Sequence, residues 1–227
     1  LLMATPIPNN SAVFSLSEIL ACTAGRVRGP LADGAMQVCG VSTDTRTMRG
    51  GEAFVALSGE RVDGHEHLAM AASKGASLAV VEREVRAPAG LTVVRVASTL
   101  NALGALAKAH LKRWRDDDAN RKVIAITGSA GKTTTREATA VLLGIVAPGR
   151  VHSASGNLNN RIGVPMTVFG ISDHHNYAVL ELGTNEPGEI GALTRMVQPD
   201  AAVLTLIAAA HLSGLVDIET VAREKAE

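Results

Sequence analysis

The sequence is poor in aromatic side chains, which make up 2% of its 227 residues, although hydrophobic residues reach 46%. At this length the chain can form one large domain or two small ones. Its core must be built from Ala, Val and Leu. Such a core is expected where helices pack on the aliphatic strands of a parallel sheet.

Long apolar runs and a basic leader are also lacking. The longest apolar run, Ala201–Ala210, is too short to cross a bilayer and is interrupted by Thr205. The start, Leu1–Pro6, has no basic stretch followed by an apolar one. The two cysteines, Cys22 and Cys39, have no metal-ligand spacing, which agrees with reduced thiols. We therefore expect a cytoplasmic protein with no membrane span and no signal peptide.

Charge of one sign is not in excess, because 22 Lys and Arg residues balance 22 Asp and Glu residues. A general nucleic-acid-binding protein would carry a basic excess. A local basic pocket is still compatible with this balance. We therefore expect small-molecule partners and no nucleic acid.

The clearest boundary is the acidic stretch 116–120, which separates a helical pattern from an aliphatic strand. We predict a small mixed α/β domain over residues 1–115, a linker over 116–120 and a parallel-sheet domain over 121–227. In the first domain, strands are predicted at 36–41, 53–57, 78–81 and 92–96, and helices at 17–24, 65–73 and 99–114. In the second, strands are predicted at 123–127, 177–182 and 201–206, and helices at 132–143, 188–197 and 218–227. Because the last helical pattern is still running at residue 227, we expect this second domain to be truncated.

The strongest motif lies between the strand 123–127 and the helix that follows it. It comprises Gly128, Ser129, Ala130, Gly131, Lys132, Thr133 and Thr134. Backbone N–H groups of such a loop surround phosphate oxygens, and the helix start favours an anion. Lys132 would contact the β- and γ-phosphates of a nucleotide, and the Thr133 hydroxyl would ligate Mg²⁺. The glycine spacing is shorter than usual, but the strand–loop–helix context favours phosphate binding over a plain turn.

Polar residues that follow the later strands are candidate metal ligands. Glu181 closes the run 178–181 within the predicted strand 177–182, and His211 follows the predicted strand 201–206. Both are expected at the sheet edge that carries the glycine loop. A carboxylate and an imidazole there would hold metal ions that bridge phosphates. A capping or salt-bridging role for Glu181, and an ordinary loop position for His211, are the alternatives.

Three other segments have weaker signals. The asparagines of the run 157–160 suit sugar hydroxyls, peptide groups or phosphates, and equally suit a turn. The segment 42–46 offers hydroxyl, Asp and Arg groups for a ribose or diphosphate, although a capped turn is the simpler interpretation. By its own neighbours, Lys225 belongs to a solvated helix face.

These segments, in this order, resemble the Mur ligases of bacterial peptidoglycan synthesis. The resemblance rests on 44–46, 54–65 and 127–134, and three further runs, 156–165, 181–190 and 208–214, resemble the branch that uses D-Ala-D-Ala. It implies a uridine-binding first domain and a P-loop ATP-binding second domain. It also implies an amide ligation, in which ATP converts the terminal carboxylate of UDP-MurNAc-tripeptide to an acyl phosphate that the amine of D-Ala-D-Ala attacks.

The resemblance implies roles for the catalytic residues. Lys132 and Thr133 would serve ATP and a first Mg²⁺, with Glu181 as a ligand of that metal. His211 would ligate a second Mg²⁺. Lys225 matches a lysine that the family carbamylates, which turns a cation into an anion that supports the second metal.

The resemblance also implies substrate contacts. Thr45 and Arg46 match the uridine-diphosphate region, and Asn157 and Asn160 match the stretch that faces the muramoyl-peptide. Thr45 stands where serine is common in the family, and Ala226 stands where glycine is expected. We expect a monomer whose partners are UDP-MurNAc-tripeptide, ATP and D-Ala-D-Ala.

Two other interpretations are compatible with the glycine loop. One is a different ligase, either a relative that adds a single amino acid to a muramoyl peptide or a folylpolyglutamate synthase, and the asparagine run 157–160 argues against both. The other is a nucleotide-binding module without turnover. Because the family has further adenine- and D-Ala-D-Ala-binding parts, we expect these 227 residues to be inactive alone.

Overall fold

The computed structural model describes residues 10, 12–28, 36–59, 62–154, 156–184, 186–208 and 218–226. The chain forms two compact units, one of residues 10–110 and one that contains the described residues from 111 onwards. The division falls within helix α3 (Thr99–Asp117), so Asp116 and Asp117 continue a helix rather than forming a linker. The domain limits at 115 and 121 stay a prediction.

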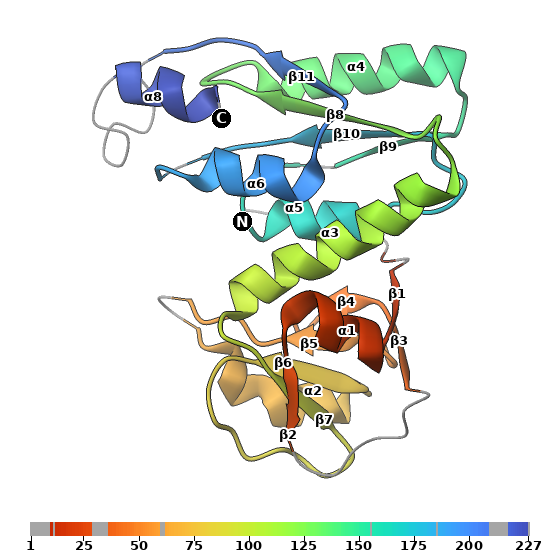
Figure 1. Ribbon diagram of the computed structural model, residues 1–227, viewed down its shortest axis with the longest axis vertical. Coiled ribbons are helices and arrows are strands. Elements are labelled where there is room, and N and C mark those ends of the chain that lie inside the picture. Colours follow the sequence, from red (N-terminus) through yellow and green to blue (C-terminus); the bar gives the residue numbers. More distant parts are fainter. Residues whose placement is uncertain are drawn as a thin grey trace. The chain divides into compact units, whose positions relative to one another are not determined.

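The unit of residues 10–110 is the small mixed α/β domain that the sequence predicts. Its five-stranded sheet has the order β2 (Arg26–Arg28), β7 (Thr92–Arg95), β6 (Leu78–Val81), β5 (Ala53–Val55) and β4 (Val41–Ser42) (Figure 1). Strands β4 to β7 are parallel neighbours, and β2 is antiparallel to β7. Two more strands, β1 (Val13–Ser15) and β3 (Gln37–Cys39), form a separate antiparallel pair.

The single strand predicted over 36–41 is wrong, because β3 and β4 belong to different sheets. Gly40 separates them with a φ of +116°, a backbone conformation that glycine adopts without strain. A Cβ at this position would lie 2.9 Å from the Glu52 side chain. The chain therefore turns at Gly40, from the pair with β1 to the larger sheet.

Local sequence explains where the helices of this unit begin. Helix α1 (Leu16–Thr23) starts at a capping box, in which Ser15 accepts from the Glu18 N–H and Glu18 accepts from the Ser15 N–H. Helix α2 (Leu68–Ser73) continues a 3-10 turn, η1 (Gly64–His67). It packs on the sheet through aliphatic residues and one Phe, as expected for a core poor in aromatics. This cluster comprises Phe54, Ala56, Leu68, Ala71, Ala76, Ala79, Val81, Leu91 and Val93.

The second unit is built on a parallel sheet. Its strand order is β11 (Ala201–Leu204), β8 (Lys122–Thr127), β10 (Tyr177–Glu181) and β9 (Val151–Ser153). Helix α4 (Lys132–Val146) covers one face, and α5 (Gly163–Val168) and α6 (Glu189–Val197) cover the other (Figure 1). The predicted parallel-sheet domain is confirmed. Strand β9 and helix α5 were not predicted, because each is short.

The strand order explains where this sheet can bind a ligand. From β8 the chain crosses by α4 to β9, whereas from β10 it crosses by α6 to β11 on the other side of β8. The two connections leave the sheet on opposite faces, so a crevice forms beyond the carboxyl ends of β8 and β10. The glycine loop and Glu181 both lie at this edge.

Helix α8 (Ile218–Lys225) is attached to α6 by a buried carboxylate. Both oxygens of Glu224 accept backbone N–H groups at the start of α6, from Gly188 at 2.6 Å and from Ile190 at 2.9 Å. The cap residue Gly188 has no side chain to do this itself, and a carboxylate suits the positive end of a helix. The contact fixes the end of α8 and, with it, the position of Lys225.

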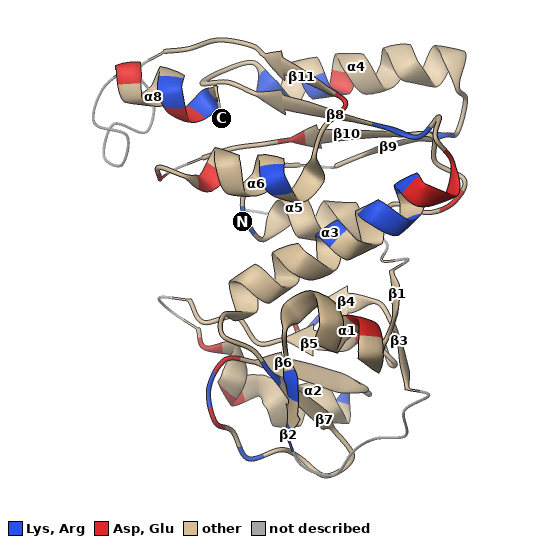
Figure 2. Cartoon of the chain, viewed as in Figure 1, with Lys and Arg blue, Asp and Glu red and all other residues tan. Residues whose placement is uncertain are grey.

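The second half of α4 presents large apolar side chains to solvent. Val141, Leu142, Ile145 and Val146 are 67%, 64%, 71% and 73% exposed, and Figure 2 shows charged residues only near the start of this helix. Patches of this kind often mark a surface that another protein segment covers. Within the described ranges, no helix combines the length and apolar character that a bilayer crossing needs.

Three histidines gather beside β9 in the second unit. The ring of His175 lies 5.0 Å from that of His152 and 3.9 Å from that of His174, and its Nδ1 accepts the Ser172 N–H at 3.0 Å. His152 also contacts the Thr167 carbonyl at 2.8 Å. Burial, followed by the charges of His152 and His174, lowers the pKa of His175 from 6.5 to about 4. The folded state therefore favours neutral His175.

This shift predicts a loss of stability in mild acid. Because the folded pKa lies below the ordinary one, the stabilisation is complete above pH 6.5 and is lost as the pH falls toward about 4. His175→Asn keeps an acceptor for Ser172 and should flatten the pH dependence of the free energy of unfolding, measured by urea denaturation across this range. His174→Asn, at an exposed position, should change it less. Equal slopes in His175→Asn and the unmodified chain would contradict the prediction.

Candidate nucleotide-binding site

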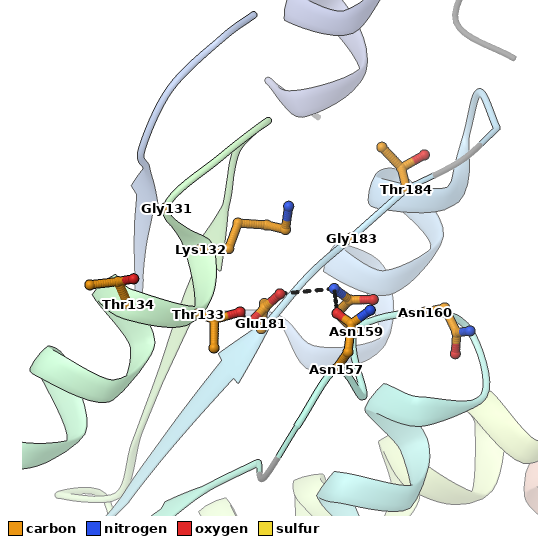
Figure 3. A pocket seen from close by; sticks show the side chains of 10 residues that line it. All are labelled: Gly131, Lys132, Thr133, Thr134, Asn157, Asn159, Asn160, Glu181, Gly183 and Thr184. Carbon is orange, nitrogen blue, oxygen red and sulfur yellow. Dashed lines mark hydrogen bonds between the residues drawn. The ribbon is translucent and has the colours of Figure 1, made fainter. Parts of the chain in front are cut away.

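A cavity of about 350 Å³ opens at the carboxyl ends of β8 and β10 (Figure 3). Its walls come from the start of α4, from the segment before α5 and from the end of β10. The lining residues are Gly131, Lys132, Thr133, Thr134, Asn157, Asn159, Asn160, Glu181, Gly183 and Thr184. The cavity thus joins the predicted phosphate loop, a predicted metal ligand and the asparagine run.

The glycine loop keeps its shape through glycine conformations and contacts from the chain after β11. Gly128 has a φ of +145°, and a Cβ there would lie 2.0 Å from the Thr205 hydroxyl. That hydroxyl donates to the Ala130 carbonyl at 2.6 Å, and the Ser129 N–H donates to the Leu206 carbonyl at 2.7 Å. Gly131, at a φ of +80°, begins α4 without a side-chain cap. The first N–H groups of α4 therefore have no intrahelical partner and suit an anion.

Lys132 and Thr133 are the first two residues of α4, directly after the glycine loop. The Lys132 ammonium donates to the Gly128 carbonyl at 2.8 Å, and its side chain reaches into the cavity in Figure 3. The Thr133 hydroxyl donates to Glu181 Oε2 at 2.9 Å. The expectation that Glu181 emerges beside the glycine loop is thus met, while the catalytic roles of these residues stay predictions.

Glu181 is a buried carboxylate, only 3% exposed. Its Oε1 accepts the Asn159 amide at 2.8 Å, and its Oε2 lies 3.6 Å from Nη1 of Arg136. With the Thr133 hydroxyl, these groups compensate the loss of water around the charge. The hydroxyl and carboxylate oxygens together fit Mg²⁺, which prefers one or two such ligands and takes the rest from phosphate and water.

The three asparagines of the run contribute to the cavity in different ways. Asn157 and Asn160 both line it, but the Asn160 side-chain oxygen accepts the N–H groups of Ile162 at 3.1 Å and Gly163 at 2.8 Å, at the start of α5. Asn159, which was not predicted to bind substrate, bridges Asn157 and Glu181 (Figure 3). The run therefore forms both a turn and part of the cavity wall.

Lys225 is buried, at 5% exposure, so the solvated-face interpretation of its sequence neighbours is wrong. Burial lowers the pKa of Lys225, the positive charge of Lys132 lowers it further, and the Glu224 carboxylate opposes the shift. The neutral amine is therefore more accessible to Lys225 than to a lysine exposed to solvent. His211 lies outside the described residues.

Thr45 and Arg46 lie in the other unit, in the capped turn that was the simpler interpretation. The Arg46 guanidinium donates to both oxygens of Asp44, at distances of 2.6 to 3.0 Å, and the Arg46 N–H donates to the same carboxylate. This pairing lowers the pKa of Asp44. A bound diphosphate would have to compete with Asp44 for Arg46, and the predicted substrate role stays untested.

Arg136 was not singled out from the sequence, and Asn159 was noted only as a member of the asparagine run, without a role of its own. Arg136 lies three positions after Thr133 on α4, and this spacing places both on one helix face. That periodicity is a usable signal. No comparable signal distinguishes Asn159 from Asn157 and Asn160, because the contact with Glu181 depends on how the loop turns.

A buried parallel strand, a glycine loop, a helix and a carboxylate on the neighbouring strand define an α/β domain of the P-loop type. Comparison with protein families is more specific. Residues 126–227 match the family model described as the Mur ligase middle domain, and residues 37–111 match the one described as the Mur ligase family catalytic domain. The chain belongs to the Mur ligase family.

Curated relatives include UDP-N-acetylmuramoyl-tripeptide–D-alanyl-D-alanine ligases. The enzyme of Bacillus subtilis is 40% identical over 205 residues, which are 88% of this chain and 43% of that protein. The enzyme of Escherichia coli is 38% identical over 201 residues, which are 88% of this chain and 42% of that protein. The chain thus spans about two fifths of the length of these relatives.

Solved structures of MurF proteins are also similar to this chain. MurF from Acinetobacter baumannii superposes with a TM-score of 0.83 at 35% identity, covering 96% of this chain and 46% of that protein. MurF from Thermotoga maritima, solved in complex with ADP, superposes with a TM-score of 0.70 at 30% identity, covering 82% and 41%. The fold expected from the sequence resemblance is therefore confirmed.

The contact between Asn159 and Glu181 gives a prediction for the metal-free protein. Asn159→Asp would replace a donor with a second carboxylate next to Glu181, so the free energy of unfolding should fall by about 1–3 kcal/mol. Added Mg²⁺ should restore part of the loss by neutralising the pair. Thermal unfolding with and without Mg²⁺ measures both effects.

Asn160→Asp is the matched control, because it keeps the oxygen that accepts the N–H groups at the start of α5. This variant should remain within about 0.5 kcal/mol of the unmodified chain. The prediction would be contradicted if the two variants were destabilised equally. It would also be contradicted if Mg²⁺ did not raise the stability of Asn159→Asp.

Proposed function

We propose that this chain forms the nucleotide- and UDP-muramoyl-peptide-binding part of an ATP-dependent ligase that joins D-Ala-D-Ala to UDP-MurNAc-tripeptide. The main support is the cavity in which the glycine loop, Glu181 and the asparagine run meet. The identity of 38% to 40% with ligases of that specificity, over 88% of the chain, supports the same substrates. We further propose that the ligase is cytoplasmic and monomeric.

The proposed reaction has two steps. A terminal carboxylate oxygen of UDP-MurNAc-tripeptide attacks the γ-phosphorus of ATP, which gives an acyl phosphate and ADP. The amine of D-Ala-D-Ala then attacks the acyl carbon, and phosphate leaves as the amide forms and the amine proton is released. The first step brings two anions together, so the site must supply positive charge and fixed orientation.

The chain's own groups suit this requirement. Lys132 would leave the Gly128 carbonyl and donate to the phosphates, beside the N–H groups at the start of α4. Thr133 and Glu181 would hold Mg²⁺, and His211 would hold a second ion. Bound Mg²⁺ supplies neutralisation of the phosphate charge. Asn157 and Asn160 would face the muramoyl-peptide.

Lys225 would act after carbamylation. A neutral lysine amine attacks CO₂, an N–C bond forms and a proton is lost, which leaves a carbamate anion. The lowered pKa of Lys225 increases the fraction of neutral amine, in support of this modification. In the other unit, Thr45 and Arg46 would bind the uridine diphosphate.

The role of Lys132 is testable in the complete ligase. Lys132→Ala should lower substrate-dependent phosphate release by about 100-fold or more, because one cationic donor to the transferred phosphate is lost. The fold should persist, since this side chain lines a cavity. Lys122→Ala, at the opposite end of β8 and ion-paired with Asp200, should keep near-normal turnover. A folded, fully active Lys132→Ala enzyme would refute the assignment.

The role of Lys225 has its own test. Lys225→Ala should lose most ligation activity and regain part of it with added short carboxylic acids, which replace the carbamate. Removal of bicarbonate should also slow the unmodified ligase. Lys112→Ala, on the exposed face of α3, should show neither effect. Full activity of Lys225→Ala without any additive would contradict a catalytic role and would show that Lys225 is buried without serving the reaction.

A further inference from the structure

Arg136 is a buried arginine behind the cavity. It lies on α4, one turn after Thr133, and its side chain is 3% exposed. It is not among the residues that line the cavity, so a role through its neighbours fits its position better than direct contact with a phosphate. A buried guanidinium is costly unless specific partners satisfy it, so its partners indicate its role.

Those partners connect two walls of the cavity. Nη1 of Arg136 donates to the Gly156 carbonyl at 2.8 Å and lies 3.6 Å from Oε2 of Glu181. Nη2 contacts Glu137 at 3.2 Å, near solvent. Gly156 directly precedes Asn157, and Glu181 ends β10. One guanidinium group therefore contacts both the carboxylate and the segment that begins the asparagine run.

The other contacts of Glu181 come from residues that line the cavity. Thr133 and Asn159 both donate to Glu181 and both line the cavity. A ligand that enters can take over those donors. Arg136 is not among the residues that line the cavity, so a ligand that redirects Thr133 and Asn159 would leave its contact with Glu181 in place.

We propose that Arg136 is a positioning residue that fixes the spacing between the Glu181 carboxylate and the segment Gly156–Asn160. This inference rests on the proposed function, in which Glu181 serves the metal and the asparagine run serves the muramoyl-peptide. Loss of the guanidinium disturbs both at once. Lysine cannot replace it, because an ammonium group is a compact point charge on a flexible stem, whereas a guanidinium is a rigid planar fork.

The decisive experiment uses Arg136→Lys in the complete ligase. Calorimetry of ADP binding over a Mg²⁺ series should show the half-saturating Mg²⁺ concentration raised about tenfold, as for other residues that orient a metal ligand. The KM for UDP-MurNAc-tripeptide should rise in the same variant. Unchanged Mg²⁺ dependence in a folded Arg136→Lys protein would overturn the proposal, even if the melting temperature fell.

Arg121→Lys is the matched control for loss of a buried arginine. Arg121 is also largely buried and donates to the carbonyls of Trp114 and Asp173, none of which lines the cavity. Its variant should lose thermal stability while its Mg²⁺ dependence stays normal. An equal Mg²⁺ shift in Arg121→Lys would assign both effects to general destabilisation and overturn the proposal.

Two further measurements keep the outcome clear. If Arg136→Lys does not fold, Glu137→Ala replaces it. Removing the outer contact of the guanidinium should raise the half-saturating Mg²⁺ concentration by roughly twofold, and the absence of a rise would count against the proposal.

Ligation by the unmodified complete ligase is assayed in parallel. Its absence would overturn the proposed function, while the Mg²⁺ dependence of ADP binding would still decide the role of Arg136.

Discussion

The second unit depends on one electrostatic requirement, the compensation of a carboxylate buried at the end of a central strand. Glu181 is 3% exposed, and a carboxylate without partners in such a position would be far too costly to remain charged. Its partners come from two other stretches of chain, Thr133 and Arg136 from α4 and Asn159 from the asparagine run. Satisfying one charge therefore fixes the start of α4, the asparagine run and β10 relative to each other.

The sheet topology makes this convergence possible. Because β8 and β10 are parallel neighbours, the segments that follow them leave at the same edge. Strand β11 pairs with β8 on the side opposite β10. Thr205, directly after β11, donates a hydrogen bond to the Ala130 carbonyl of the glycine loop. Opposite charges line the cavity at this edge, where the Lys132 ammonium and the Glu181 carboxylate are both present. An anionic ligand with a bound cation has complementary groups there.

Features encoded by adjacent residues could be predicted from the sequence. The glycine loop follows an aliphatic strand and opens a helix, and Glu181 ends a strand, so local pattern and parallel pairing were enough to bring them together. Lys225 could not be placed in this way. Its burial depends on the contact of Glu224 with residues 34 and 36 positions earlier, and a charged run on a short helix does not reveal a distant partner.

The other differences also have local physical causes. Residues 36–41 have a uniform strand pattern, and only the positive φ of Gly40 divides them between two sheets. The three asparagines are chemically identical, so their separate roles arise from the turn they form rather than from their composition. Arg136 is an intermediate case, because helical periodicity relates it to Thr133 but cannot show that Glu181 lies opposite.

The Gly128 carbonyl, which accepts a hydrogen bond from the Lys132 ammonium, competes with any ligand for that donor. A ligand that binds the Lys132 ammonium must first displace the Gly128 carbonyl. The net free energy of binding is therefore the difference between the strengths of these two hydrogen bonds. A neutral acceptor of similar strength gains almost nothing from this exchange, whereas a multiply charged phosphoryl group forms shorter and stronger charge-assisted bonds. This exchange would therefore favour a phosphoryl group over an uncharged ligand of similar size.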